Sequence, residues 1–434
     1  MPSLGHVSRR DFMRQMALAA TSTVLPWSPS HATSRSGNIL PGRIGIIEDL
    51  NASTGSTVNL NVVTQMVDTG LIELTGNSDP VTAWESLFPE LDATKRITIK
   101  VNILNDLVPT RWEMVKGITD RLVQMLGGTF PPGNITIFDK VPSGFPSTMA
   151  GCGFTAGHFP GIVISGESNP DTEVWVGDTT LLLSSHIATC DYFINCPVLK
   201  DHHQAGKRWT LGFKNHIGSV SPMTCHSYEP RLLSLSASPH LQNKTKLIIT
   251  SAIHAIFTNG PEGPAQGWSL FPEESTPNLI MLSTDPVSSE HWGIHLINQQ
   301  RAIHNITIYQ DTYCQHAAEP PYNLGVYDFA AHDVFTSLPS PQNLSASHTG
   351  LGTMVSWSPV AGASKYIVFR SGDPYFAPDP WGGTNVIGET TGTSYLDADS
   401  ATESPGYYIV RAFRACWYSA DSARVAVFSF PLDQ

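Results

Sequence analysis

The sequence predicts an α/β region, with a mainly parallel sheet and helices on both faces, followed by an all-β sandwich. Between residues 43 and 299, short β-branched apolar runs alternate with segments whose apolar residues recur at helical spacing. The runs are apolar on nearly every residue, which is typical of strands covered on both faces by helices. After residue 342 the helical spacing ends, and short alternating runs separated by turn residues replace it.

The elements of the α/β region follow from this periodicity. The expected strands are residues 43–49, 96–102, 134–140, 161–165, 191–199, 246–253 and 278–283. The strand at 191–199 is interrupted by Pro197, because proline cannot donate to a hydrogen-bond ladder. The expected helices are residues 58–74, 111–126 and 287–299.

Polar side chains stand where several of these strands end. Asn102 closes the strand 96–102, Lys200 and His202 follow the strand 191–199, and Asp285 follows the strand 278–283. In parallel sheets, ligands bind beyond the carboxyl ends of the strands. We therefore expect these four residues at one edge of the sheet.

Residues 196–218 combine basic residues and histidines with one Asp and one Asn behind an apolar run. One interpretation is a solvated loop. The other is a cleft that binds an anionic or metal-bound ligand, because a buried and unpaired polar group costs several kcal/mol.

The motifs of this segment resemble those of domain-of-unknown-function family 362. The pattern is Pro-x-x-Lys-x-His from Pro197, followed by Lys-Asn-x-x-Gly from Lys214. Three further stretches match in order: Lys100-Val101-Asn102, residues 260–264 (Gly-Pro-Glu-Gly-Pro) and Asp285-Pro286-Val287. The resemblance extends over roughly residues 43–334 and favours a binding site, but it implies no particular activity.

Lys214 and Asn215 form the pair to which we give most weight within this resemblance. Beside Trp209 and Phe213, the ammonium of Lys214 would lose part of its hydration, which lowers the pKa and favours a base or nucleophile. A lysine that stays charged would instead hold a carboxylate or phosphate, with Asn215 adding a donor. The structural alternative is a pairing of Lys214 with Asp201 or Asp285.

Histidines in this region raise the question of a metal. His202, His203 and His216 are the candidate ligands, since neutral imidazole is the commonest transition-metal ligand. The cofactor is otherwise unknown. The six cysteines form no Cys-x-x-Cys or ferredoxin-type run, so no iron–sulfur cluster is expected.

Asp285 has two interpretations of its own. With Glu290 nearby on the same predicted helix, it would take an acid, base or metal role in a cleft. Alternatively it caps the helix, where a carboxylate is favourable at the N-terminus.

The N-terminus resembles a twin-arginine signal peptide. Arg9 and Arg10 precede an apolar segment, residues 16–27, that is too short to span a membrane, and Ser30-His31-Ala32 resembles the end of a cleavage site. We expect residues 1–32 to be removed, a periplasmic or extracellular location in a bacterium, and no transmembrane anchor.

The C-terminal segment is similar to a fibronectin type III domain. Trp357, Tyr366, Tyr395 and Tyr407-Tyr408 occur in the order of such a sandwich, and these aromatic residues are expected to form its core. The predicted boundaries are residues 33–336 for the α/β domain, 337–342 for a proline-rich linker and 343–434 for the sandwich.

The leading hypothesis is an exported enzyme acting on a small anionic substrate. Its expected catalytic residues are Lys214, His202 and Asp285, and its expected substrate-binding residues are Lys100, Asn102, Lys200 and Asn215. The net charge of −12 argues against nucleic acid as a partner. The alternative is a non-catalytic envelope protein that binds a ligand, with a polymer or protein partner on the C-terminal domain.

Overall fold

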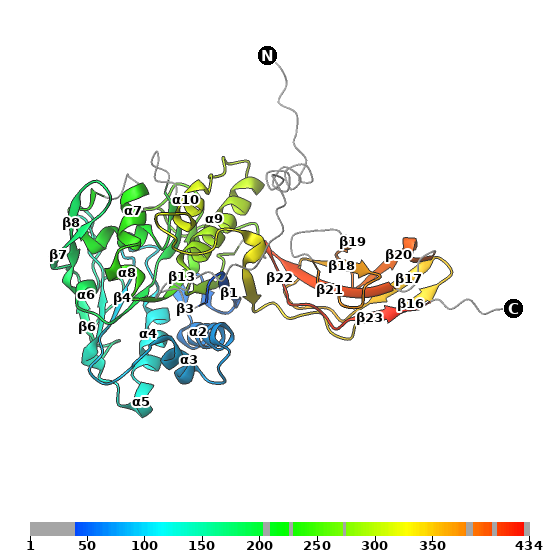
Figure 1. Cartoon of the computed structure of the whole chain (residues 1–434), viewed down its shortest axis with the longest axis horizontal. Helices are drawn as coiled ribbons and strands as arrows, with labels where there is room; N and C mark the ends of the chain where they lie inside the picture. The colour runs from blue at the N-terminus through cyan, green and yellow to red at the C-terminus, as the bar shows by residue number, and fades with distance from the viewer. Residues whose placement is uncertain are drawn as a thin grey trace, which may run out of the picture. The chain divides into compact units, whose positions relative to one another are not determined.

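The structure is a computed structural model that describes residues 40–202, 209–224, 229–271, 275–378, 385–401 and 406–428 (Figure 1). For residues 209, 210 and 401 it describes the backbone alone. The expected signal peptide, residues 1–32, lies outside the described residues. The described residues all fall within a compact unit that spans residues 36–434.

A mixed sheet organises the α/β region. Its strands follow the order β15-β1-β14-β13-β9-β4-β5-β6, with β10 beside β13 and β11 beside β10. Their bounds are β1 Arg43–Glu48, β4 Ile97–Lys100, β5 Ile135–Phe138, β6 Val163–Ser165, β9 Tyr192–Asn195, β10 Val198–Asp201, β11 Trp209–Thr210, β13 Thr245–Ile256, β14 Leu279–Ser283 and β15 Asp333–Thr336. Pro197 separates β9 from β10, which confirms the interruption expected there.

The prediction of a mainly parallel sheet is confirmed only in part. Strands β9, β4, β5 and β6 are parallel neighbours, and β13 is parallel to both β9 and β10. Strand β14, however, runs antiparallel to both of its neighbours, β1 and β13. Its carboxyl end therefore points away from the edge at which β4 and β10 end.

Helices cover both faces of this sheet, as the alternation of strand side chains requires. Ile47 packs into the core cluster that contains α2, α3 and α4, whereas Ile44 and Ile46 pack into the cluster that contains α9 and α10. These helices are α2 Leu60–Thr75, α3 Pro80–Leu87, α4 Trp112–Leu122, α9 Pro286–Ile303 and α10 Thr312–Ala318. The three expected helices are confirmed as α2, α4 and α9.

Capping residues set the helix ends. The Asn59 side chain accepts from the backbone N–H of Val62 to begin α2, and Gly76, at φ 71°, ends that helix in the left-handed conformation. The short helices are α5 Met125–Gly128, α6 Ser185–Ala188, α7 Glu229–Ser236 and α8 Pro239–Gln242. The 3₁₀ turns are η1 Pro132–Asn134, η2 Lys214–Ser219, η5 Phe329–Ala331 and η6 Ala398–Ala401.

Two smaller sheets accompany the α/β region. Strands β7 Pro170–Trp175 and β8 Thr180–Ser184 form a hairpin to which β12 Val220–Ser221 adds an edge. Strands β2 Ser53–Thr54 and β3 Thr57–Val58 form a short ribbon. The hairpin was not predicted from the sequence, because much of β7 is exposed and lacks a continuous apolar run.

The C-terminal region is all-β, with antiparallel pairing throughout its described strands. One sheet contains β16 Ser345–Thr349, β17 Gly352–Ser356 and β20 Ser394–Asp397. The other contains β18 Lys365–Ser371, β19 Val386–Thr390, β21 Gly406–Arg414, β22 Trp417–Tyr418 and β23 Val425–Val427. Trp357, Tyr366 and Tyr408 are buried, as expected of core residues, whereas Tyr395 and Tyr407 are half-buried.

No described helix combines the length and the apolar character needed to cross a membrane. The domain boundaries at residues 33, 337 and 343 stay predictions. The five cysteines in the described residues are buried free thiols.

Candidate functional site

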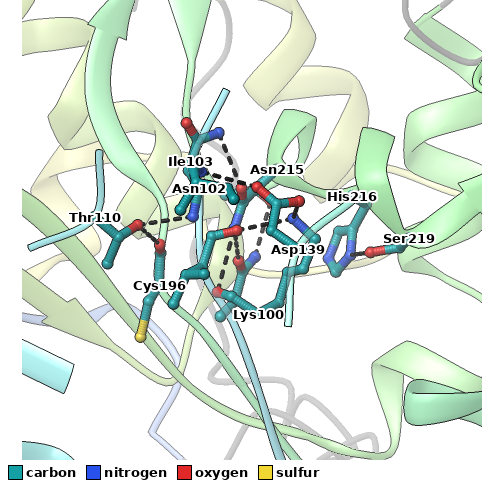
Figure 2. A network of polar contacts seen from close by, with 12 residues as sticks. Lys100, Asn102, Ile103, Thr110, Asp139, Cys196, Asn215, His216 and Ser219 are labelled. Carbon is teal, nitrogen blue, oxygen red and sulfur yellow. Dashed lines mark hydrogen bonds and ion pairs between the residues drawn. The ribbon is translucent and has the colours of Figure 1, made fainter. Parts of the chain in front are cut away.

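A buried ion pair joins the ends of two neighbouring parallel strands. Lys100 is the last residue of β4, and Asp139 directly follows β5. The Lys100 Nζ lies 2.6 Å from Asp139 Oδ1 and donates to the Val101 carbonyl at 2.8 Å (Figure 2). Burial lowers the pKa of Lys100, and the charge of Asp139 opposes this change. The pair therefore holds a lysine and a carboxylate together inside the protein.

Asp139 is itself fixed by the backbone around it. Its Oδ2 accepts the backbone N–H of Ile103 at 2.8 Å. Gly218 approaches so closely that a Cβ atom there would lie 2.4 Å from Asp139 Oδ1 and 2.7 Å from the Lys140 carbonyl oxygen. This position in η2 therefore requires glycine because of the close approach.

A chain of three side-chain amides begins at Lys200. The Lys200 Nζ donates to Asn102 Oδ1 at 2.8 Å, and Asn102 Nδ2 donates to Asn215 Oδ1 at 3.1 Å. Asn215 Nδ2 donates in turn to Asn195 Oδ1 at 2.7 Å, and Asn195 Nδ2 donates to the Gly212 carbonyl at 2.8 Å. All four side chains in this chain are buried. We call these four side chains the amide chain.

The backbone beneath the amide chain is fixed by Thr110. The backbone N–H of Asn102 donates to Thr110 Oγ1 at 2.8 Å, and the Thr110 hydroxyl donates to the Cys196 carbonyl at 2.6 Å (Figure 2). Thr110 thus connects the segment after β4 with the segment between β9 and β10.

Lys200 is a fully buried cation that lacks a close carboxylate among the described residues. Its Nζ contacts only neutral oxygens there: Asn102 Oδ1 and, at 3.2 Å, the Val108 carbonyl. Burial lowers the pKa of Lys200 to about 7. At neutral pH the amine and the ammonium are therefore both well populated.

Three residues that the sequence predicts as site residues lie in the 3₁₀ turn η2. Lys214, Asn215 and His216 are all buried there. The His216 Nδ1 lies 3.4 Å from Ser219 Oγ, and burial, aided by the charge of Lys100, lowers the pKa of His216 to about 3. His216 is therefore neutral at physiological pH.

The cleft expected at residues 196–218 stays a prediction. Lys200, His202, Lys214 and Asn215 are buried. Buried polar groups can also pair with one another, as Lys200 and Asn215 do through Asn102 in the amide chain. His203 and residues 204–208 lie outside the described residues.

Asp285 does not join the site. Its carboxylate accepts the backbone N–H groups of Ser288 at 2.9 Å, Gly42 at 2.9 Å and Val326 at 3.0 Å. It caps α9, which confirms the capping interpretation. The expectation that it shares an edge with Asn102 and Lys200 fails because β14 is antiparallel, so the end of this strand leads away from them.

Metal binding at His202, His203 and His216 stays a prediction. Among the described residues, no group of three or more His, Cys, Asp or Glu side chains is arranged to hold a metal ion. His203 falls outside that description.

Several residues of the site escaped the sequence analysis. Asp139 was placed inside the expected strand 134–140, although it follows β5 and so obeys the same strand-end rule as Asn102. Asn195 lies within a strand and carried no local signal. Asn105 donates to the carbonyls of Pro261 at 2.8 Å and Gly263 at 2.7 Å, which brings the Gly-Pro-Glu-Gly-Pro motif to this edge.

Comparison with known proteins identifies one family model. The model of a domain of unknown function, DUF362, matches residues 97–295, a range that contains the ion pair and the amide chain. No curated protein matches the chain.

Solved structures match short parts of the chain. An Fn3-like protein from Clostridium thermocellum is 28% identical over 23% of this chain and 100% of its own length, with a TM-score of 0.19. Pectate lyase PelI from Erwinia chrysanthemi is 18% identical over 20% of this chain and 27% of its own, with a TM-score of 0.17. The FN1-FN3 domains of chicken CNTN1 are 14% identical over 22% of this chain and 35% of their own, also with a TM-score of 0.17. These similarities are weak, and a fibronectin type III domain at residues 343–434 stays a prediction.

Proposed function

We propose that the chain is an enzyme that binds a small anionic substrate at the carboxyl ends of β4 and β10 and uses Lys200 to transfer a proton. The observation that carries this proposal is the contact set of the Lys200 Nζ, which meets neutral oxygens and no carboxylate among the described residues. A buried positive charge without a carboxylate in contact favours an anion nearby.

The pKa of Lys200 supports the catalytic part. A general base works best when its pKa lies near the working pH, and burial lowers the pKa of Lys200 to about 7. The amine accepts a proton at Nζ, and the ammonium returns it. Perturbed groups of this kind concentrate at functional sites.

The other residues have distinct parts in this proposal. Asn102 orients the Lys200 Nζ, and Asn215 holds Asn102 in place. Lys100 is held by Asp139, and this ion pair fixes the end of β4 next to Asn102. Lys214 binds the anion and His202 assists in proton transfer, as expected from the sequence, whereas Asp285 has no part because it caps α9.

Anion binding by the full chain tests this proposal. Isothermal titration with a library of small carboxylates and inorganic phosphate should give binding at pH 6 that weakens above pH 7, because the Lys200 ammonium loses its charge. Lys200→Met should abolish it. Lys116→Met serves as the control, since Lys116 pairs with Asp120 on the partly exposed face of α4. Unchanged binding by Lys200→Met would refute the proposal.

A second candidate function is ligand binding without catalysis, with the C-terminal region attached to a polymer or a protein. The observation that favours it concerns hydrogen bonds. The polar groups of the amide chain bond to one another, and so do those of the ion pair, without any ligand. Cosedimentation of the full chain with peptidoglycan or chitin, combined with anion binding but no turnover, would support this function over the first.

We also propose that the chain is exported through the twin-arginine route to the periplasm or beyond. The support is the sequence alone, in which Arg9 and Arg10 precede a short apolar segment.

A further inference from the structure

Three buried side-chain atoms around Arg111 have no hydrogen-bond partner within the described residues. They are Arg111 Nε, Glu113 Oε2 and His254 Nδ1. None of them belongs to the amide chain or to the ion pair. Leaving a buried polar atom unpaired costs about 1 to 3 kcal/mol, so the donor Arg111 Nε and the atom His254 Nδ1 point to a missing partner.

The backbone brings His254 and Arg111 to Lys200. In the sheet, Lys200 pairs with Ile256 of β13, two residues after His254, where the register between β10 and β13 is irregular. The Lys200 Nζ donates to the Val108 carbonyl at 3.2 Å, and Arg111 Nη2 donates to the Leu107 carbonyl at 3.4 Å. Both cations are therefore attached to neighbouring carbonyls of one loop.

Electrostatic effects confirm that these groups are close. Burial lowers the pKa of His254 to about 4, and the positive charge of Arg111 contributes to this decrease. The charge of Arg111 also contributes to the low pKa of Lys200, after burial. Arg111, His254 and Lys200 thus act on one another within the same region of low polarity.

The hydrogen bond of His254 Nε2 determines whether His254 Nδ1 is a donor or an acceptor. The Nε2 lies 2.8 Å from the Gly55 carbonyl oxygen, which only accepts, so Nε2 carries the proton. His254 is neutral at pH 7, and its Nδ1 therefore presents a lone pair. His254 is 4% exposed, so this acceptor is buried.

One carboxylate acts on Arg111 directly. Burial lowers the pKa of Arg111 and the nearby charge of Glu113 opposes this decrease, while burial raises the pKa of Glu113 and the charge of Arg111 opposes that increase. No ion pair joins Arg111 and Glu113 among the described residues, and Glu113 Oε2 has no hydrogen-bond partner there. Burial also raises the pKa of the Cys152 thiol, which is therefore neutral. Asp106 acts on Cys152, and Asp139 is already paired with Lys100.

Resting on the proposed function, we infer that Arg111 binds an anionic oxygen of the substrate while His254 Nδ1 accepts a hydrogen bond from a hydroxyl group of the same molecule. The substrate class is a small oxyanion that also carries an O–H donor. Hydroxy carboxylates and monoprotonated phosphates share this chemistry. A simple carboxylate or sulfate lacks the donor and would leave the His254 Nδ1 without a partner.

Matched pairs of small anions test the inference on the full chain. Glycolate and acetate differ by one hydroxyl group, and at pH 6 phosphate carries protons that sulfate lacks. In isothermal titration, we expect glycolate to bind about tenfold more tightly than acetate, or phosphate about tenfold more tightly than sulfate, the usual effect of one net hydrogen bond. The pair that shows the preference identifies the carboxylate or the phosphate class.

Variants assign the two contacts. His254→Leu should remove the preference for the hydroxylated anion and leave acetate or sulfate binding unchanged, whereas His254→Gln, which keeps an amide oxygen, should retain part of the preference. Arg111→Gln should weaken both members of the pair at least tenfold. Arg111 makes no side-chain cap on α4, so its loss removes no capping bond. Lys116→Gln, on the same helix, should bind both members as the wild type does.

The outcomes separate this inference from the proposed function. Equal binding of both members of each pair by the wild type would overturn the hydroxyl contact while anion binding at Lys200 stands. No binding of any of the four anions would refute both. Should His254→Leu fail to fold, the wild-type comparison and Arg111→Gln still decide the result.

Discussion

The Lys200 Nζ lies 2.8 Å from Asn102 Oδ1, although the two residues are 98 positions apart in the sequence. This contact joins the end of β10 to the segment after β4, and it gives the buried ammonium a neutral partner. The character of the site depends on that partner being an amide.

Asn102→Asp tests this dependence. A carboxylate at the same position favours the charged form of Lys200, so the pKa of Lys200 should rise from about 7 by about 1 to 3 pH units. Titration of the ¹⁵N-labelled lysine Nζ by NMR between pH 5 and 11 measures this change. A Lys200 pKa that remains near 7 in the variant would show that Asn102 does not control it.

Lys200→Met should make the stability of the protein respond differently to pH. The folded-state pKa of about 7 lies below the 10.5 of an unperturbed lysine, so between these values the unfolded chain binds more protons and the wild type gains stability as pH rises. The ammonium therefore destabilises the fold most below pH 7. The free energy of unfolding of the variant, relative to that of the wild type, should therefore decrease by up to about 1.4 kcal/mol per pH unit between pH 7 and 10.

Urea unfolding at pH 6, 8 and 10, followed by tryptophan fluorescence, gives this comparison. Lys116→Met, which removes a partly exposed ion pair, should change the free energy of unfolding by less than about 1 kcal/mol. A difference between Lys200→Met and the wild type that is the same at all three pH values would contradict the low pKa of Lys200.

Gly218→Ala should destabilise the protein by about 1 to 3 kcal/mol. The added Cβ would lie 2.4 Å from Asp139 Oδ1 and 2.7 Å from the Lys140 carbonyl oxygen, so the ion pair with Lys100 must shift. Gly133→Ala is the matched control, because its nearest neighbour would lie 3.9 Å away. Thermal unfolding of both variants measures the effect, and equal melting temperatures would argue against the close packing at Gly218.

Replacement of Arg9 and Arg10 by lysine tests the export proposal. The paired arginines are the feature read by the twin-arginine route, so the double variant should accumulate as precursor in the cytoplasm. Cell fractionation followed by mass spectrometry of the N-terminus provides the measurement. Export of the variant at the wild-type level would exclude this route.

Strand order explains which site residues could be predicted from the sequence. Asn102 follows β4 and Lys200 lies at the carboxyl end of β10, and both strands run parallel to a neighbouring strand, so the strand-end rule places these two residues correctly. Asp285 follows a strand with an equally apolar sequence, but strand direction depends on pairing with distant neighbours, and β14 is antiparallel. The local pattern contains no information about that pairing.

The other contacts of the site could not be predicted from the sequence, because they join residues that are far apart along the chain. Asn102 and Asn215 meet across 113 positions, and His254 and Gly55 across 199. Periodicity reports burial of apolar residues, so it gives no signal for a buried Asn195 within a strand or for Arg111 before a helix. The fold class could be predicted because it depends on local spacing, whereas these contacts depend on topology.

The amide chain has one direction from end to end. Each amide turns its oxygen toward Lys200 and its nitrogen away, so the three dipoles align and their negative ends face the ammonium. Reversing one amide would set oxygen against oxygen and nitrogen against nitrogen, so the orientation of each depends on the others. These dipoles solvate the ammonium of Lys200 as water would, yet amides carry no net charge, so a charged partner for this ammonium would have to come from an incoming anion.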